Sequence, residues 1–168
     1  MDTLIRYADI IGESIVDGVG IRVAAFLQGC PRYCPGCHNP KLLAAEGGTL
    51  VTEEAFAGLL LKKITPLHQG ITFTGGDPLL QPEAVLKVIL LLRKSAPRLN
   101  IWLYTGYTFD EVRHWEIMQY IDVLVDGPFI LEKRDISLPW RGSSNQRVIN
   151  VPASLRSGKV VEMLFESH

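Results

Sequence analysis

The chain has 168 residues, of which 47% are hydrophobic and 21% are charged, and its formal net charge is −1. This composition is that of an ordinary globular protein with a substantial core, and the near-neutral charge argues against a nucleic-acid partner or an anionic membrane surface. The most apolar stretch, residues 84–92, is much shorter than the roughly 20 residues that span a bilayer, and no cationic, apolar leader opens the sequence. We therefore expect a cytoplasmic protein with a single domain over residues 1–168.

Apolar, β-branched runs alternate along the chain with patterns typical of amphipathic helices. A long segment rich in glycine and proline, residues 28–50, is predicted to be a loop. The predicted strands are short apolar runs, several of them ending on glycine: 4–11, 21–27, 71–74, 99–104, 121–125, 148–151 and 160–164. The predicted helices have apolar residues at helical spacing: 53–64 after Thr52, 81–94, and 109–118.

This alternation implies right-handed crossovers and a mostly parallel sheet. The strands are too few to close an eight-stranded barrel, which takes about 250 residues. We predict an α/β fold with a compact, open, partial (β/α) barrel, and a doubly wound flat sheet is the alternative. Both folds bind ligands at the carboxyl ends of the strands, where the turns that begin at Gly75, Thr105 and Asp126 fall.

The three cysteines, Cys30, Cys34 and Cys37, have a C-x3-C-x2-C spacing within the predicted loop. An odd number of cysteines packed so closely is a poor disulfide framework. Thiolates are soft ligands that suit iron–sulfur clusters or zinc, and structural zinc takes four protein ligands. Because there is no fourth cysteine, we favour a [4Fe-4S] cluster with one iron open to an exogenous ligand.

Zinc is the alternative metal, with His38 completing a Cys3His site. Residues adjacent in sequence, such as Cys37 and His38, rarely reach the same tetrahedral centre without backbone strain. His68 and His114 lack a supporting spacing, and we expect them to be surface or hydrogen-bonded histidines.

The cysteine motif after a buried strand, followed by Gly75-Gly76-Asp77-Pro78 after the next strand, resembles the radical S-adenosylmethionine superfamily. The Cys-Pro-Gly-Cys sequence at 34–37 is similar to the activating proteins of anaerobic ribonucleoside-triphosphate reductase. Four further segments agree with that family: 12–22, 38–40, 125–129 and 141–147. Two departures are Gly36, where the superfamily often has an aromatic residue, and Val19, where many relatives have proline.

The resemblance implies that Cys30, Cys34 and Cys37 ligate the [4Fe-4S] cluster and that the domain has the radical S-adenosylmethionine type of fold. The residues implied to bind S-adenosylmethionine lie at strand ends: Gly75, Gly76, Asp77, Thr105, Gly106 and Asp126. Further candidates for cofactor or partner contacts are polar: Arg22, Asn39, Arg141, Asn145 and Arg147. No side chain needs to act as a general acid or base.

The implied function is that of a glycyl-radical activating enzyme. S-adenosylmethionine is cleaved reductively at the cluster, with an electron from flavodoxin or ferredoxin, and the 5′-deoxyadenosyl radical abstracts hydrogen from a glycine of anaerobic ribonucleoside-triphosphate reductase. Because that glycine lies inside a large partner, one side of the sheet is expected to stay open. The alternatives are an activase of another glycyl-radical enzyme, a deazaguanine synthase-like radical enzyme, and, in another class, a non-catalytic iron–sulfur or zinc-binding module.

Overall fold

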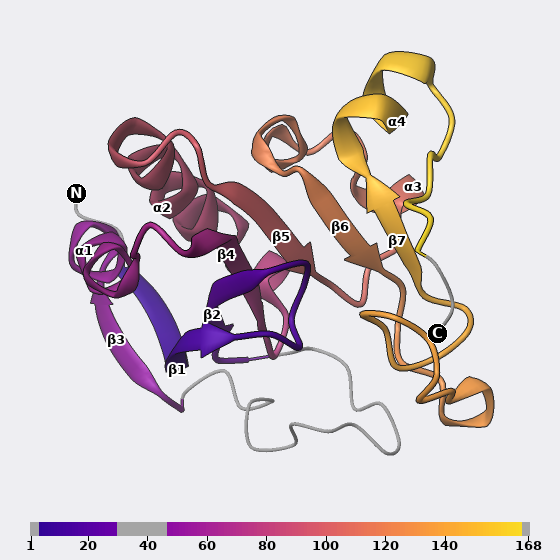
Figure 1. Cartoon of the computed structure of the whole chain (residues 1–168), viewed down its shortest axis with the longest axis horizontal. Helices are drawn as coiled ribbons and strands as arrows, with labels where there is room; N and C mark the ends of the chain where they lie inside the picture. The colour runs from indigo at the N-terminus through magenta and orange to yellow at the C-terminus, as the bar shows by residue number, and fades with distance from the viewer. Residues whose placement is uncertain (1–3, 30–46, 166–168) are drawn as a thin grey trace.

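The computed structural model describes residues 4–29 and 47–165. In these residues one seven-stranded sheet runs in the order β3-β1-β2-β4-β5-β6-β7 (Figure 1). Its strands are β1 (Leu4–Ser14), β2 (Ile21–Leu27), β3 (Thr49–Thr52), β4 (His68–Gly75), β5 (Asn100–Tyr104), β6 (Val123–Asp126) and β7 (Arg147–Asn150). The helices are α1 (Glu53–Lys63), α2 (Pro82–Ser95), α3 (Phe109–Val112) and α4 (Val151–Ser157), with 3-10 turns η2 (Pro78–Leu80), η3 (Glu116–Tyr120) and η4 (Leu131–Lys133).

The centre of the sheet is parallel and its two ends are antiparallel. Strands β2, β4, β5 and β6 pair in parallel, whereas β1 and β3 at one end and β7 at the other pair antiparallel. The register places Leu27 opposite Gly75 and Tyr104 opposite Val125, so the central strands end at a common edge. The predicted mixed α/β fold with its parallel strands is therefore confirmed.

The local sequence explains where the two long helices begin. The Thr52 hydroxyl accepts a hydrogen bond from the Ala55 amide at 3.1 Å, which caps α1 where the sequence predicts a helix start. Pro82 occupies the first turn of α2, where its missing N–H costs nothing. Both helices therefore follow the sequence pattern closely.

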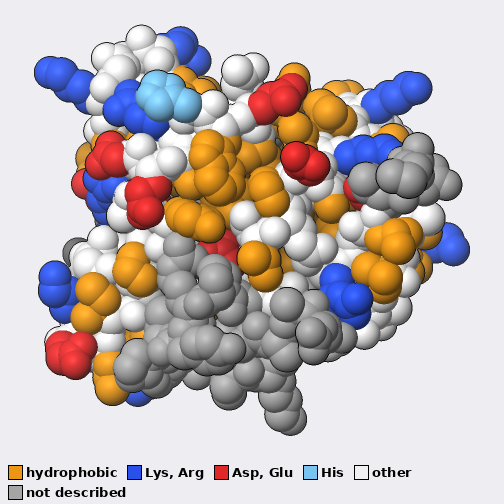
Figure 2. Space-filling model, turned by 180° about the vertical axis from the view of Figure 1, so that it is seen from behind, with side chains coloured by type: hydrophobic (Ala, Val, Ile, Leu, Met, Phe, Trp, Pro, Cys, Tyr) orange, Lys and Arg blue, Asp and Glu red, His pale blue; other side chains and the backbone are white. Residues whose placement is uncertain are grey.

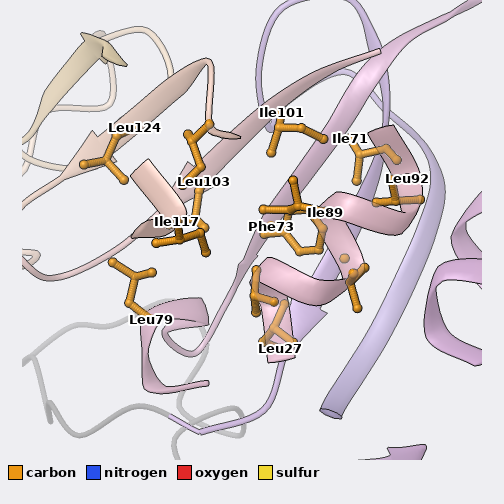
Figure 3. Close-up of a cluster of buried hydrophobic side chains, with 14 of the residues drawn as sticks. Leu27, Ile71, Phe73, Leu79, Ile89, Leu92, Ile101, Leu103, Ile117 and Leu124 are labelled. Atoms are coloured by element: carbon orange, nitrogen blue, oxygen red, sulfur yellow. The ribbon is translucent and has the colours of Figure 1, made fainter. Parts of the chain in front are cut away.

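One face of the sheet packs against α1 and α2 and holds the main core. Ile89 and Leu92 of α2 point toward the strand residues Ile71, Phe73 and Ile101 (Figure 3). All five side chains are almost completely buried. Close packing of this kind supplies most of the stability of a small α/β protein.

The opposite face of the sheet has a different cover. Because side chains alternate along a strand, neighbouring residues point to different faces. In β5, Leu103 points into the helix-side core, whereas Trp102 belongs to a second, smaller apolar cluster. Trp140 lies edge-on against Trp102 at 5.8 Å between ring centroids, and Phe165 packs on Trp140 in turn. Trp140 and the C-terminal residues Met163 and Phe165 thus cover part of this second face, which we call the open face.

Helix α4 is not predicted, since Val151 is expected to end a strand and instead begins that helix. Three further elements differ in the structure. Residues 49 and 50, predicted as loop, belong to β3, because pairing with β1 outweighs their glycine-rich surroundings. The predicted helix 109–118 ends at Val112, and a 3-10 turn follows from Glu116. Between them Trp115 has an extended backbone (φ −70°, ψ 139°), and its ring contacts Tyr107. The predicted strand 160–164 makes only an isolated bridge, from Glu162 to Ile149.

Hydrophobic side chains gather near the centre of one face of the molecule, and acidic and basic side chains are interspersed around them (Figure 2). Among the described helices, none has both the length and the apolar character needed to cross a membrane.

Candidate functional site

A cavity of about 730 Å³ opens at the common edge where the parallel strands end. Its walls come from the ends of β4 and β5, from the chain after β6, and from two segments, residues 15–17 and 136–142. Four of the predicted cofactor-binding residues line it: Gly75, Gly76, Thr105 and Gly106. A volume in this range accommodates a cofactor-sized ligand.

Gly75 and Gly76 form the turn that ends β4, and the position of Gly75 admits no side chain. Its φ is +109°, and a Cβ atom would lie 2.6 Å from the backbone N and O of Leu27. The Gly76 amide donates to the Leu27 carbonyl at 2.9 Å, and the Asp77 amide donates to the Gly29 carbonyl at 2.7 Å. The turn is therefore fixed against the end of β2, at the last described residue before Cys30.

Asp77 joins the ends of two strands. Its buried carboxylate accepts hydrogen bonds from the Thr105 hydroxyl at 2.9 and 3.0 Å, from the Gly106 amide at 3.0 Å and from the Leu79 amide at 2.9 Å. It is not among the residues that line the cavity. These contacts position Thr105 and Gly106, and the predicted contact between Asp77 and the cofactor stays a prediction.

Asp126 is also buried and also points to protein groups. Its carboxylate accepts from the Phe109 amide at 2.8 Å and pairs with the Arg147 guanidinium at 2.7 Å. This hydrogen bond raises the pKa of Arg147 above its ordinary value. Neither residue is among those that line the cavity, and their ion pair, which the sequence does not predict, joins β6 to β7 while the Phe109 contact adds α3.

The segment 141–147 builds one wall of the cavity through its own hydrogen bonds. The Gln146 amide group bonds the Gly142 amide and the Gly127 carbonyl, and the Asn145 amide donates to the Pro128 carbonyl. Arg141 lines the cavity, and its buried Nε atom has no hydrogen-bond partner among the described residues. Asn145 therefore shapes the wall, whereas Arg141 forms part of its surface.

Several residues that line the cavity are not predicted from the sequence. Asp17 is one, and its carboxylate accepts a hydrogen bond from the Ser14 hydroxyl at 2.6 Å. Tyr104 is another, and burial raises the pKa of its phenol, with a further contribution from Asp17 that Arg22 opposes. Trp140 has a left-handed backbone (φ 63°), and its buried indole nitrogen has no hydrogen-bond partner among the described residues. The glycine-rich segment 12–22 indicates a special loop, but no local signal indicates Tyr104 or Trp140.

Not all of the remaining predicted residues lie in the part of the chain that the structure describes. Cys30, Cys34, Cys37, His38 and Asn39 lie outside the described residues. Within residues 4–29 and 47–165, no group of three or more His, Cys, Asp or Glu residues could hold a metal ion. His68 is buried and hydrogen-bonded to Thr65 and to the Gly12 carbonyl, which confirms the prediction of a hydrogen-bonded histidine.

Comparisons with known proteins agree with an iron–sulfur interpretation of the cysteine motif. A family model described as a 4Fe-4S single cluster domain matches residues 16–149. A solved structure, QueE from Escherichia coli, is similar at a TM-score of 0.46 and 19% identity, over 62% of this chain and 53% of that one. That structural similarity is too distant to bear on function.

Curated sequences are much closer. Proteins named anaerobic ribonucleoside-triphosphate reductase-activating protein match from Haemophilus influenzae (37% identity, 84% of this chain, 95% of the relative) and Escherichia coli K12 (39%, 85% and 97%). A third, from Enterobacteria phage T4, is 36% identical over 85% of this chain and 92% of its own length. Identity at this level over nearly full length confirms the family that the sequence resembles. The chain belongs to the family of anaerobic ribonucleoside-triphosphate reductase-activating proteins.

Proposed function

We propose that the chain is a radical S-adenosylmethionine enzyme that installs a glycyl radical in anaerobic ribonucleoside-triphosphate reductase. The observation that carries this proposal is the 37–39% identity to proteins named for that activation over 84–85% of the chain. The match to a 4Fe-4S single cluster domain, which includes Cys30, Cys34 and Cys37, supports the cluster. A flavodoxin or ferredoxin is the proposed electron donor.

The cavity residues suit S-adenosylmethionine by their chemistry. Backbone at Gly75–Gly76 and the Asp17 carboxylate offer acceptors for an ammonium group, and Arg141 offers a cation for a carboxylate. Apolar side chains such as Phe129 and Trp140 offer surface to a nucleoside. When bound at the cluster, the cofactor supplies the radical that removes hydrogen from the target glycine.

The protein's own part is to position groups and to exclude water. Asp77 holds Thr105 and Gly106 in place at the cavity edge, so their backbone and hydroxyl groups need no rearrangement when a ligand binds. Apolar walls keep competing hydrogen donors from a reactive centre. The proposed roles of Asp77 and Asp126 are accordingly indirect, through the groups that they fix.

The architecture that we propose is an open, partial barrel within a single domain over residues 1–168. Strands β3 and β7 stand at opposite ends of the described sheet and are not paired with each other. An edge that stays open suits a protein substrate, because a glycine inside a large partner must approach the cavity.

The proposal is tested by anaerobic reconstitution with iron and sulfide, followed by dithionite and S-adenosylmethionine. We expect about four irons per chain, 5′-deoxyadenosine as product and, with the reductase added, a glycyl radical detected by electron paramagnetic resonance. Cys34→Ala should abolish product formation, because two thiolates hold a cubane cluster poorly. His38→Ala is the matched control and should retain iron and product.

Each contrary result identifies an alternative. Bound iron without 5′-deoxyadenosine would indicate a non-catalytic iron–sulfur protein. Tightly held zinc that is lost in His38→Ala would indicate a Cys3His zinc site. Formation of 5′-deoxyadenosine without a radical in the reductase would indicate an enzyme for another substrate.

A further inference from the structure

Arg22 is a fully buried cation on the open face of the sheet. It lies in β2, where its neighbours Val23 and Ala25 belong to the helix-side core, so it projects to the opposite face. The Cζ atom of its guanidinium lies over the Trp102 ring, 5.4 Å from the ring centroid. A side chain of this kind is almost never fully buried unless its charge is compensated.

The compensation comes from neutral acceptors. Arg22 donates to the Thr72 hydroxyl at 2.8 Å and to the carbonyls of Val19, Ile71 and Asn100 at 3.0, 3.1 and 3.2 Å. Among the described residues, no carboxylate forms an ion pair with it. Burial lowers the pKa of Arg22 to about 10, which records the cost of keeping the charge away from water.

These acceptors belong to three separate parts of the chain. Ile71 and Thr72 are in β4 and Asn100 is in β5, whereas Val19 is in the loop of residues 15–20 between β1 and β2. The Thr72 hydroxyl, which accepts from Arg22, itself donates to the Asp17 carbonyl at 2.7 Å. The loop is therefore attached to the sheet at two carbonyls, directly by Arg22 and indirectly through Thr72.

The surrounding backbone leaves room for this one side chain. Gly18 has φ +139°, and a Cβ atom there would lie 2.9 Å from Cδ of Arg22. A Cβ atom on Gly70 would lie 2.5 Å from the Arg22 Nη2 atom. Two glycines from different segments thus border the guanidinium, which fits a site shaped for arginine.

The attached loop forms a wall of the cavity. Ile15, Val16 and Asp17 line it, and the first two are about 70% exposed, with little apolar packing of their own to hold them. A segment with so few buried contacts opens easily unless hydrogen bonds restrain it. Ser14 bonds Val16 and Asp17 within the same segment, so the attachment of the loop to the sheet depends on the two carbonyls that Arg22 and Thr72 hold.

We propose that Arg22 is a positioning residue that fixes the loop of residues 15–20 through Val19 and Thr72, so that Asp17 and its neighbours form one wall of the ligand cavity. The ligand of that cavity rests on the proposed function, whereas the attachment of the loop does not. Arg22 touches neither substrate nor cofactor in this arrangement and acts through the loop.

The test compares Thr72→Val, which removes the relaying hydroxyl at nearly constant volume, with Thr72→Ser, which retains it. Hydrogen exchange of the cofactor-free chain is followed by mass spectrometry in peptides that cover residues 15–20 and α2. We expect about tenfold faster exchange in the loop of Thr72→Val and unchanged exchange in α2, because the hydroxyl's two hydrogen bonds, from Arg22 and to the Asp17 carbonyl, are lost locally. Thr72→Ser should exchange as the wild type does, and Arg22→Lys should resemble Thr72→Val.

A second readout follows activity in the reconstituted enzyme. In 5′-deoxyadenosine formation, Thr72→Val should raise the KM for S-adenosylmethionine several-fold, whereas kcat should stay within about twofold. The reason is that the loop must be ordered before S-adenosylmethionine binds. Unchanged loop exchange in both Thr72→Val and a folded Arg22→Lys would overturn the proposal. Faster exchange spread equally over the loop and α2 would overturn it too, since that pattern means general destabilisation. If the wild type forms no 5′-deoxyadenosine, the proposed function fails, and loop exchange still decides the role of Arg22.

Discussion

The two faces of the sheet bury different kinds of side chain. The helix-covered face buries almost purely aliphatic and aromatic side chains, such as Phe73 and Leu103, against α1 and α2. The open face buries polar groups, among them Arg22 and Thr72, beneath irregular chain. Packing on the first face is not directional, whereas burial of Arg22 and Thr72 on the second depends on hydrogen bonds with a defined direction.

Because of this difference, we expect substitutions on the two faces to affect the protein in different ways. Substitutions on the helix-covered face should act through the lost transfer of apolar surface, which is large and independent of pH. Substitutions on the open face and at its strand ends should act through individual hydrogen bonds and charges, which are smaller, local and in one case dependent on pH. Four predictions, taken in order of decreasing effect, test that division.

The largest effect is expected from Phe73→Ala at the centre of the helix-covered face. Phe73 is fully buried, and its loss should lower the free energy of unfolding by about 3–5 kcal/mol, as measured by urea denaturation. Leu67→Ala is the matched control, since Leu67 is 74% exposed and should change stability by less than about 0.5 kcal/mol. A loss below about 1.5 kcal/mol for Phe73→Ala would mean that this face is not the main source of stability.

Asp126→Ala should have the next largest effect. It leaves the Phe109 amide and the Arg147 guanidinium without their carboxylate partner. Breaking a buried pair costs about 3–5 kcal/mol, and because the Arg147 side chain is 30% exposed we expect about 2–3 kcal/mol in urea denaturation.

The control for Asp126 is Asp110→Ala. The Asp110 side chain is 71% exposed and lies 3.9 Å from Arg113, so its loss should be nearly neutral. Equal losses in the two variants would show that the Asp126 pair does not hold β6 and β7 together, and a direct role at the cavity would become the better explanation.

The orientations of Asp77 and Asp126 also show where sequence reasoning reaches its limit. Glycine turns after apolar runs predict that both aspartates lie at strand ends, and both do. The direction of each carboxylate, however, depends on partners 28 and 21 residues further along the chain, Thr105 and Arg147. Such pairings follow from sheet register, which no local pattern encodes.

The same reason accounts for the elements of the fold that sequence predicts and misses. The stripe of α2 that includes Ile89 and Leu92 is buried as predicted, because helical periodicity is a local signal. Strand β3 is missed because it exists through its pairing with β1, more than forty residues earlier. The tail around Glu162 is predicted as a strand from its apolar residues, yet most of it covers the open face as irregular chain.

Thr105→Val at the cavity edge is expected to have the third-largest effect on stability. It removes the hydroxyl that bonds both oxygens of the Asp77 carboxylate, so we expect a loss of about 2 kcal/mol in the free energy of unfolding. Thr105→Ser keeps the hydroxyl and should lose less than half as much. If the two variants are equally destabilised, the methyl group of Thr105 matters more than its hydrogen bonds, and the edge resembles the apolar core.

The smallest effect is expected from Tyr104→Phe and appears only at high pH. Tyr104 lines the cavity, and burial raises the pKa of its phenol above the value of about 10 in an unfolded chain. As the pH rises through 10, the unfolded chain releases the phenolic proton while the folded chain keeps it, so stability is lost with rising pH. Between pH 9 and 11 this contribution is about 1.4 kcal/mol. Tyr104→Phe should lack it, so urea denaturation at the two pH values should show a smaller loss in the variant than in the wild type. An equal loss in both proteins would mean that the Tyr104 phenol titrates as freely in the folded chain as in water. Burial on the open face would then not shield this phenol from solvent.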